Sequence, residues 1–476
     1  MYIRVLQVDL YLTDCTTRLP FRFGMFTLTF APLCTARMLI ETENGVRSEG
    51  FSADLLVPKW FEKNLLTSER DDVSALIDSA RTAREVVVSR HRQPATVFDH
   101  WWDLYTDCVA SQGDSAPDLL VHGFGVALLE RAMMDAACRA AKRSFFDALS
   151  GDLFGFDPAR AHRQLKTWDL AASLPRRPVD SIHIRHTIGL LDVLRERDIT
   201  DENRVDDGFP ASLEAAIRCY KLTHFKIKLC GDQLQDLTRL RDIFDVFKSE
   251  TERPAQFTID GNEQFDDLGE LADLLDALSA DAAGTQFLPG LLYIEQPLPR
   301  SRTLDSAPNA AMRRLEEYAP VLIDEADDGL GAFPRAAELG YRGVSVKNCK
   351  GVFRALINRG LCDLSDGRLF QSAEDLTTLP VLALQQDLAT VAALGLTHVE
   401  RNGHHYFRGL DHLSEEEAHG ALASHPDLYR HDAQCVSLRI EDGQLRLGSL
   451  QGVGFGYDVP ICTSTRTAVN AWHWPE

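Results

Sequence analysis

The sequence predicts an α/β protein in which a small α+β domain precedes a (β/α)₈ barrel, and three observations lead to this fold. The first part of the chain alternates apolar and polar residues and then changes to a helical spacing. Beyond about residue 178, short apolar runs alternate with helical patterns. Eight such units follow one another, which is the number that closes a barrel. A chain of 476 residues is long enough for both parts.

The predicted first domain, residues 1–155, has strands followed by helices. The runs IRVLQVDLYL, FTLTFA and ARMLIETENG alternate as strands do, and Asn44-Gly45 is a turn signal, so we expect a small antiparallel sheet. From about Val73 the apolar spacing becomes helical. It is clearest in LLVHGFGVALLERAMMDAACRAAKRSFFDALSG, which predicts one long buried helix closed by Gly151.

The predicted barrel spans residues 156–433 and begins with a connector rich in Pro and Arg, roughly residues 156–178. Two connections in the barrel are long, 191–208 and 298–310, and are compatible either with lids over a site or with decoration. The expected strands lie near His183–Leu191, Thr223–Leu229, Gln256–Ile259, Leu291–Ile294, Val321–Ile323, Gly343–Val346, Leu369–Gln371 and Leu396–Val399.

The tail, residues 434–476, is again strand-like in its first half. The segment CVSLRIEDGQLRLGSL has Asp442-Gly443 as its turn signal. We expect this tail to return to the first domain.

Composition and charge exclude some classes of function. Fifty Lys and Arg residues stand against 71 Asp and Glu, and the net charge of −21 argues against non-specific nucleic-acid binding. We expect no signal peptide and no membrane anchor, because no apolar run approaches the ~18 residues of a membrane span. The ten cysteines form no C-x-x-C pair, as expected of reduced thiols. We therefore expect a cytoplasmic protein without nucleic-acid or membrane partners.

Five polar residues each close one predicted barrel strand. The runs FKIK, QFTIDGNE, LLYIEQP, PVLIDEAD and GVSVKNCKG supply Lys228, Asp260, Glu295, Asp324 and Lys347. Their separations of 32, 35, 29 and 23 residues each correspond to about one βα unit. Active sites of such barrels lie at the C-terminal ends of the strands, so we expect these side chains to converge at one mouth.

Three of the five, Asp260, Glu295 and Asp324, are acids on consecutive strands. Bare carboxylates that face one cavity repel one another strongly. A hard divalent cation removes this repulsion, and oxygen-only ligands suit Mg²⁺, which keeps water positions open for a substrate. The alternative is that each acid caps the helix after its strand. The register of the three acids and the flanking lysines favour the magnesium site.

Two lysines, Lys228 and Lys347, lie on strands either side of the acid-bearing ones. A carboxylate substrate bound to Mg²⁺ would have one lysine at each face of its α-carbon. The metal would neutralise charge on the substrate oxygens while a lysine takes the α-proton. Lys226, on the same strand face as Lys228, either favours the free amine of Lys228 or touches the substrate carboxylate. For a single lysine, a solvated or salt-bridged side chain is the alternative.

These motifs together resemble the enolase superfamily, specifically its muconate-lactonizing-enzyme subgroup in the mandelate racemase/muconate lactonizing enzyme family. The long helix is similar to the one that closes that family's N-terminal domain, and QSAEDLTTLP is similar to its seventh-strand segment. The resemblance covers nearly the whole chain. Its motifs are K-x-K at 226–228, D-G-N-E at 260–263, I-E-Q-P at 294–297, I-D-E-A at 323–326 and V-K-N-C-K-G at 346–351.

The resemblance implies an α+β capping domain, a modified barrel and one Mg²⁺. It implies an isomerase or lyase that abstracts the proton α to a carboxylate to give a metal-stabilised enediolate. Racemisation or epimerisation, β-elimination such as dehydration, or cycloisomerisation would follow. By match, Asp260, Glu295 and Asp324 would bind the metal, Lys228 and Lys347 would be the acid/base pair, and Asn262 and Glu325 would support the ligands or the lysines.

The substrate is less well defined by the sequence. The mandelate-racemase branch would carry His at the seventh strand, where residues 371–374 read QSAE, so that branch fits poorly. The eighth-strand region VERNGHHYFRGLD lacks the D-x-D with which dipeptide epimerases hold an amino group. The capping loops of that family close over the substrate. In the matching loops of this chain, a cation and an aromatic residue would suit a polar or anionic distal group of the substrate. Alternatively, both are ordinary loop residues. The candidate substrate contacts are Arg22, Lys59, Trp60, Glu374 and His404.

Three other functions remain alternatives at this point. A zinc hydrolase would use histidines such as His183 and His186, but their spacing of three places them on opposite faces of a strand. A Schiff-base aldolase would use Lys347 and leave the three acids without a purpose. A barrel that binds a ligand without turnover would keep the same residues. A homo-oligomer is compatible with the family, although the chain carries no interface signal.

Overall fold

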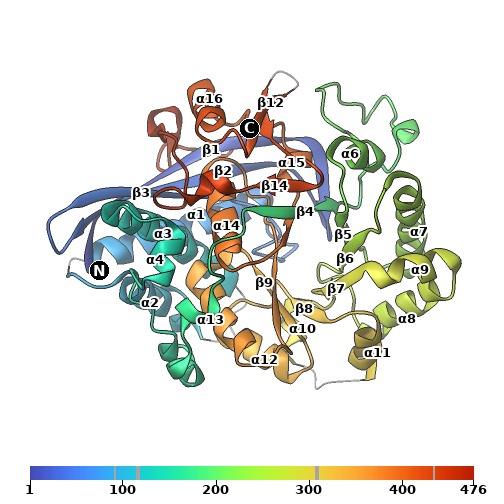
Figure 1. Ribbon diagram of the computed structural model, residues 1–476, viewed down its shortest axis with the longest axis horizontal. Coiled ribbons are helices and arrows are strands. Elements are labelled where there is room, and N and C mark those ends of the chain that lie inside the picture. Colours follow the sequence, from blue (N-terminus) through green and yellow to red (C-terminus); the bar gives the residue numbers. More distant parts are fainter. Residues whose placement is uncertain (91–92, 114–117, 306–309, 433–434, 476) are drawn as a thin grey trace.

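The computed structural model describes residues 1–90, 93–113, 118–305, 310–432 and 435–475. The predicted loop 298–310 and the predicted boundary at residue 434 lie partly outside the described residues. Figure 1 shows the helices of the first domain at the left and the barrel helices of residues 233–287 at the right, while the long blue strands of the first domain run across the upper part of the view.

The first domain is built on an antiparallel sheet, as predicted. Its strands are β1 (Ile3–Phe23), β2 (Phe26–Thr42) and β3 (Arg47–Leu55). The predicted turn is present between β2 and β3, with Gly45 at φ 77°. The helices that follow are α1 (Glu69–Arg90), α2 (Val97–Cys108) and α3 (Leu119–Ala141). Helix α3 packs on β2 and β3 and is buried along most of its length, because nearly all its residues are apolar or small.

Our prediction of a single long helix here is wrong in one respect, because the structure has two helices separated by a break. Helix α3 ends at Ala141, and Lys142 adopts the left-handed conformation. Ser144 then caps α4 (Phe145–Ser150), with its side chain accepting a hydrogen bond from the Asp147 amide. A serine that satisfies free amides of a helix start favours a new helix over continuation of the old one.

A parallel barrel forms the second unit, and the predicted fold is confirmed. Strand β11 pairs with β4 and closes the ring, while the other strands pair in chain order. The strands are β4 (Ser181–Ile188), β5 (His224–Lys228), β6 (Gln256–Asp260), β7 (Leu291–Glu295), β8 (Val321–Ile323), β9 (Gly343–Val346), β10 (Phe370–Ala373) and β11 (His398–Arg401). The main helices around them are α6 (Leu213–Tyr220), α7 (Gln233–Glu250), α8 (Leu268–Ser279), α9 (Ala282–Phe287), α11 (Ala310–Tyr318), α12 (Ala332–Glu338), α13 (Val352–Asp363) and α14 (Leu382–Ala393).

Alternation along β5 decides which side chains reach the barrel interior. Phe225 faces outward and stacks on Phe247 of α7, with ring centroids 4.2 Å apart. Because successive strand residues point to opposite faces, Lys226 and Lys228 point inward.

Two adjacent residues of α3 dock the first domain on the barrel. The Arg131 guanidinium donates to the Asn348 carbonyl and pairs with Asp54 of the same domain. Glu130 Oε1 accepts a hydrogen bond from the Phe353 amide at 2.5 Å, at the start of α13. Since Asn348 follows Lys347 directly, this contact places the first domain beside the mouth of the barrel.

The tail returns to both units. Strand β13 (Cys435–Leu438) pairs with β12 (Tyr429–Asp432), and β14 (Gln444–Arg446) pairs with β4 of the barrel. The segment predicted to rejoin the first domain therefore belongs mainly to the barrel side. The return itself is made further on, by β15 (Thr467–Ala468), which pairs with β1, and by Tyr457, whose hydroxyl donates to Asp135 of α3.

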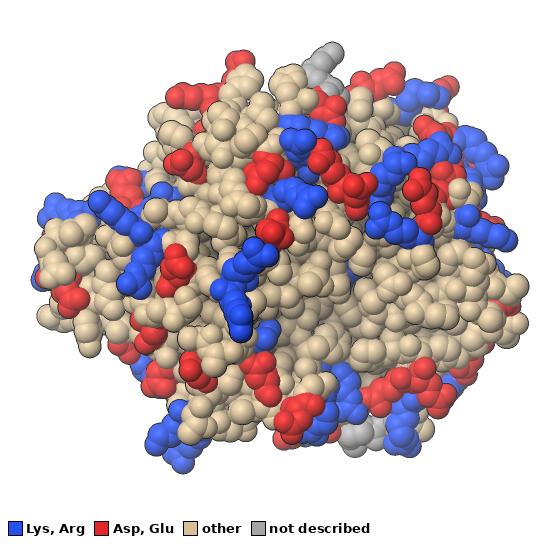
Figure 2. Space-filling view, viewed as in Figure 1, with Lys and Arg blue, Asp and Glu red and all other residues tan. Residues whose placement is uncertain are grey.

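On the surface, basic and acidic side chains are interspersed over the face seen in Figure 2. In the described part of the chain, none of the helices has the length and apolar character needed to cross a membrane.

Candidate active site

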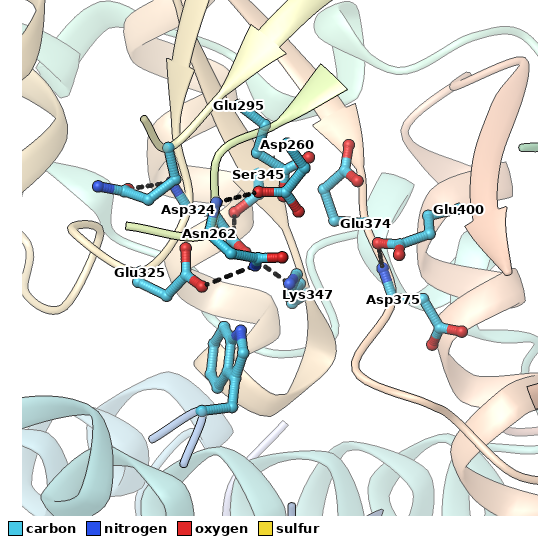
Figure 3. Close-up of polar contacts among 12 residues, drawn as sticks. Asp260, Asn262, Glu295, Asp324, Glu325, Ser345, Lys347, Glu374, Asp375 and Glu400 are labelled. Carbon is cyan, nitrogen blue, oxygen red and sulfur yellow. Dashed lines mark hydrogen bonds and ion pairs between the residues drawn. The ribbon is translucent and has the colours of Figure 1, made fainter. Parts of the chain in front are cut away.

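The five predicted strand-end residues come together at the C-terminal mouth of the barrel. Lys228 pairs in register with Asp260, and Asp260 pairs in register with Glu295, on strands β5, β6 and β7. Asp324 and Lys347 directly follow β8 and β9. Figure 3 shows Asp260, Glu295, Asp324 and Lys347 gathered around one space. The closed barrel thus places the lysines on either side of an acidic trio.

Each of the two flanking lysines is bonded to the nearest acid. Lys228 Nζ donates to Asp260 Oδ2 at 2.6 Å, and Lys347 Nζ donates to Asp324 Oδ2 at 2.5 Å. Burial alone would raise the pKa of both acids, but attraction to the lysines outweighs it, and the pKa of each is lowered. Burial would likewise lower the pKa of Lys347, and Asp324 raises it instead. Both outer acids are therefore held as carboxylates.

The central acid, Glu295, differs from the two outer acids in the direction of its pKa shift. Its Oε1 accepts a hydrogen bond from Lys226 at 2.8 Å, while its buried Oε2 has no partner. Burial, and after it repulsion from Asp260, raises the pKa of Glu295 well above its ordinary value. A buried carboxylate oxygen without a partner is costly, so this atom favours an additional cation at the trio.

Lys226 lies deeper in the barrel than Lys228 and is fully buried. Its ammonium lies 3.0 Å from Asp260, 2.8 Å from Glu295, 3.0 Å from Glu374 and 2.8 Å from Glu400. Burial would lower the pKa of Lys226, but attraction to these four carboxylates raises it well above its ordinary value. Lys226 is thus a buried counter-charge in the interior.

Glu374, which we considered as a substrate contact, lies inside this buried cluster. It accepts hydrogen bonds from Arg185 at 2.7 Å and from the Tyr293 hydroxyl at 2.6 Å, in addition to Lys226. We did not predict Glu400 as a site residue. A signal was available, since Glu400 closes the eighth apolar run just as the predicted acids close theirs.

The acidic trio does not form a ready-made metal cage. Among the described residues, no group of three His, Cys, Asp or Glu side chains is arranged to hold a metal ion. The ammonium groups of Lys226, Lys228 and Lys347 bond to the carboxylates instead. The donor set still fits Mg²⁺, because three carboxylates converge from neighbouring strands and Glu295 Oε2 lacks a partner.

Asn262 and Glu325 stand beside the trio. The Asn262 amide donates to Asp260 Oδ1 at 2.8 Å, and its side-chain nitrogen lies 3.4 Å from Glu325 Oε1. Burial, and after it repulsion from Asp324, raises the pKa of Glu325 to about 7. The contacts of Asn262 are drawn in Figure 3. The backbone of Asn262 thus contacts the trio directly, and its side chain contacts Glu325.

Three further residues, which sequence reasoning missed, fix Asp324. Gln296 Oε1 accepts a hydrogen bond from the Asp324 amide at 2.8 Å. Ser345 donates to Asp324 Oδ1, and Lys350 donates to Ser345 Oγ at 2.7 Å. Gln296 and Lys350 belong to the I-E-Q-P and V-K-N-C-K-G motifs, so their positions were visible but their roles were not.

Trp60 of the first domain covers one side of the site. Its ring lies 4.6 Å from Lys347 Nζ, within range of a cation–π interaction. Arg300 of the barrel holds this loop, since its guanidinium donates to the carbonyls of Trp60 at 2.7 Å and Phe61 at 3.0 Å. The same guanidinium pairs with Glu263.

The other candidate substrate contacts are placed differently. Lys59 Nζ donates to the Thr67 carbonyl at 2.6 Å and pairs with Asp72 at 3.1 Å, so its charge is used within its own domain. Arg22 lies near the end of β1, where its carbonyl accepts a hydrogen bond from the Leu190 amide. His404 is bonded to His186 at 3.0 Å, and burial, followed by repulsion from His186, lowers its pKa well below the ordinary value.

Sequence similarity to known proteins covers part of the chain. No protein-family model matches the chain. The L-Lys-D/L-Arg epimerase of Methylococcus capsulatus is 26% identical over 234 residues, which cover 49% of this chain and 55% of that protein. The chain thus matches about half the length of this curated relative.

Several solved structures resemble almost the whole chain, and two examples are enzymes with a bound small molecule. One is the muconate lactonizing enzyme from Pseudomonas fluorescens complexed with muconolactone, with a TM-score of 0.59, 14% identity and coverage of 96% of this chain and 97% of that one. The other is the dipeptide epimerase from Enterococcus faecalis V583 complexed with Mg and the dipeptide L-Leu-L-Tyr, with a TM-score of 0.58, 12% identity and coverage of 95% and 99%. The predicted fold, a barrel with a capping domain, is therefore confirmed, and the chain shares it with this lactonizing enzyme and this epimerase.

Proposed function

We propose that this chain is a Mg²⁺-dependent isomerase or lyase that abstracts the proton α to a substrate carboxylate. The observation that carries the proposal is the position of Lys228 and Lys347, each bonded to an outer member of the trio Asp260, Glu295 and Asp324. The fold shared with a lactonizing enzyme and with epimerases supports it.

In this proposal Asp260, Glu295 and Asp324 would hold the metal. When bound, Mg²⁺ would supply positive charge to neutralise the negative charge that develops on the substrate carboxylate. Lys228 and Lys347 would then exchange their contacts with the outer acids for the two faces of the substrate α-carbon. Without its acid partner, a buried lysine has a lower pKa, so one of the two would be a free amine that takes the α-proton, and the other would return a proton or stabilise charge. Trp60 keeps water away from the side of Lys347.

The final reaction is racemisation or epimerisation, β-elimination or cycloisomerisation, which share this first step. The similarity to the L-Lys-D/L-Arg epimerase favours a second proton transfer. The acids near the ends of β10 and β11 argue against a dipeptide substrate, because they already accept hydrogen bonds from neighbouring residues. Asp375 accepts from Thr378 and Asn402, and Glu400 accepts from Lys226 and Thr187. The aldolase and the non-catalytic barrel gain no support from the proteins compared.

Exchange of the α-proton with deuterated solvent tests the proposal, because all three reactions share that step. Acid sugars, hydroxy acids, N-acyl amino acids and dipeptides should be screened by proton NMR with Mg²⁺ present. Lys228→Ala and Lys347→Ala should lose overall turnover and keep metal binding measured by calorimetry. Lys248→Ala, an exposed lysine on α7, is the matched control and should behave as the unaltered protein. Full turnover by Lys228→Ala would refute the proposal.

A further inference from the structure

A cavity of about 270 Å³ lies between the first domain and the barrel. Its walls come from the turn between β1 and β2, from the loop 59–65, and from barrel residues that include Glu263 and Pro299. Lys63 at its wall lies 4.0 Å from Glu325 Oε1, and Glu325 directly follows Asp324. The cavity is therefore adjacent to the acidic trio.

The exposed lining of this cavity is mainly apolar. Its apolar residues are Phe23, Met25, Phe26, Leu65 and Pro299, and its polar residues are Lys59, Lys63, Glu263 and Gln264. The rings of Phe23 and Phe26 pack edge to face, with centroids 5.8 Å apart. Met25 and Leu65 are 68% and 72% exposed, so two large apolar side chains face solvent at one cavity. Such an arrangement favours an apolar occupant that would remove them from water.

The charged residues of the cavity are already neutralised. Lys59 is held by Asp72 and Thr67. Lys63 pairs with Glu263 at 3.0 Å, and Glu263 also pairs with Arg300. A charged group of a ligand would have to displace one of these ion pairs. The lining thus favours an uncharged group over the polar or anionic one that the sequence led us to expect.

The cavity is fixed relative to the trio by a close contact. Gly24 has φ +50°, and a Cβ there would lie 3.1 Å from Gln264 Nε2. Gln264 Nε2 in turn donates to the Asn262 carbonyl at 2.9 Å. The turn between β1 and β2 thus contacts the segment that follows Asp260.

We propose that this cavity holds an uncharged apolar arm, aryl or alkyl, of the carboxylate substrate. This inference rests on the proposed function, because the carboxylate end would lie at the trio. A cavity of roughly 150 Å³ admits a benzene ring. A volume of about 270 Å³ therefore admits one aromatic ring with a short linker.

The test compares four probes that differ only in their arm: N-benzoyl-, N-hexanoyl-, N-succinyl- and N-acetylalanine. Exchange of the α-proton is measured by NMR with Mg²⁺, and binding is measured in Lys228→Ala by saturation-transfer NMR. Leu65→Asp adds a charge at the cavity. Leu66→Asp is the matched control, because Leu66 is the next residue, is 94% exposed and does not line the cavity.

The benzoyl and hexanoyl probes should exchange at least about tenfold faster in kcat/KM than the succinyl probe. Leu65→Asp should lower the benzoyl value about tenfold and leave the acetyl value unchanged, whereas Leu66→Asp should change neither. A succinyl probe that equals the benzoyl probe, or equal effects of the two aspartates, would overturn the inference.

If no probe exchanges, the proposed function fails for these acids, and binding decides the inference separately. Benzoyl binding that is weakened by Leu65→Asp and unaffected by Leu66→Asp would uphold the apolar cavity. Lack of binding, or equal weakening by both, would reject it.

Discussion

The ring of Trp60 lies 4.6 Å from the ammonium of Lys347, although the two residues belong to different domains. Trp60 is 2% exposed, and its carbonyl is held by Arg300. The contact thus couples the position of a loop of the first domain to one of the proposed acid/base groups. A cation–π contact of this kind contributes roughly 0.5–2 kcal/mol.

We expect Trp60→Leu to lower kcat by about 5- to 30-fold, the change that 1 or 2 kcal/mol corresponds to. The loss would come from a less ordered Lys347 and from water reaching its side of the site. Trp60→Phe keeps an aromatic face and should retain most of the activity. Steady-state kinetics on an exchanging substrate measures both variants. Equal activity of Trp60→Leu and the unaltered protein would show that the contact has no role in turnover.

Replacing Glu295 with Gln should weaken Mg²⁺ binding. The substitution removes a charge from the centre of the trio and leaves its shape nearly unchanged. Loss of groups that only support a metal ligand costs about 10- to 100-fold in affinity, so loss of a ligand should cost at least about 100-fold. Calorimetric titration with Mg²⁺ measures this. Glu316→Gln, a control outside the site, should bind Mg²⁺ as before. Unchanged affinity in Glu295→Gln would remove Glu295 from the ligand set.

Replacing Lys226 with Met should destabilise the barrel itself. Four buried carboxylates would lose their shared cation. Removal of one partner from a buried ion pair costs roughly 3–5 kcal/mol. The free energy of unfolding, measured in urea at pH 7, should fall by about that amount. Lys248→Met on α7 should leave it unchanged. A stable Lys226→Met variant without turnover would instead indicate that Lys226 contacts the substrate.

Much of the barrel and its mouth could be predicted from local sequence. Each strand is a short apolar run, and the residue that ends it, such as Asp260 or Lys347, must lie at the mouth once the chain closes into a barrel. The partners of Lys226 could not be predicted in this way, because Glu374 and Glu400 approach it only when the last strands return beside the first ones.

The contacts between the two domains could not be predicted from the sequence either. Arg300 meets the Trp60 carbonyl 240 positions away along the chain, and no pattern around either residue marks the contact. The interruption of the long helix at Lys142 depended on the competing cap at Ser144, which a helical period does not reveal.

Three histidines at the opposite end of the barrel should make the protein sensitive to acid. His183, His224 and His398 lie on the neighbouring strands β4, β5 and β11, and the rings of His183 and His224 stack with centroids 4.4 Å apart. Burial, followed by nearby positive charge, lowers the pKa of His224 to about 4 and of His398 to about 3. The pKa of His183 is also lowered, by burial and then by Arg253.

In the unfolded chain these histidines regain a pKa near 6.5. Because the folded values are lower, the unfolded chain binds more protons below pH ~6.5, and stability falls as the pH falls toward about 4. Above pH ~6.5 the three groups should contribute no pH dependence. Urea unfolding at pH 7, 6 and 5 measures the slope. His224→Gln and His398→Gln should flatten it, since neither glutamine takes up a proton, whereas His473→Gln, an exposed histidine of the tail, should leave it unchanged. If the slope stays the same in all three variants, the acid sensitivity comes from groups other than this stack.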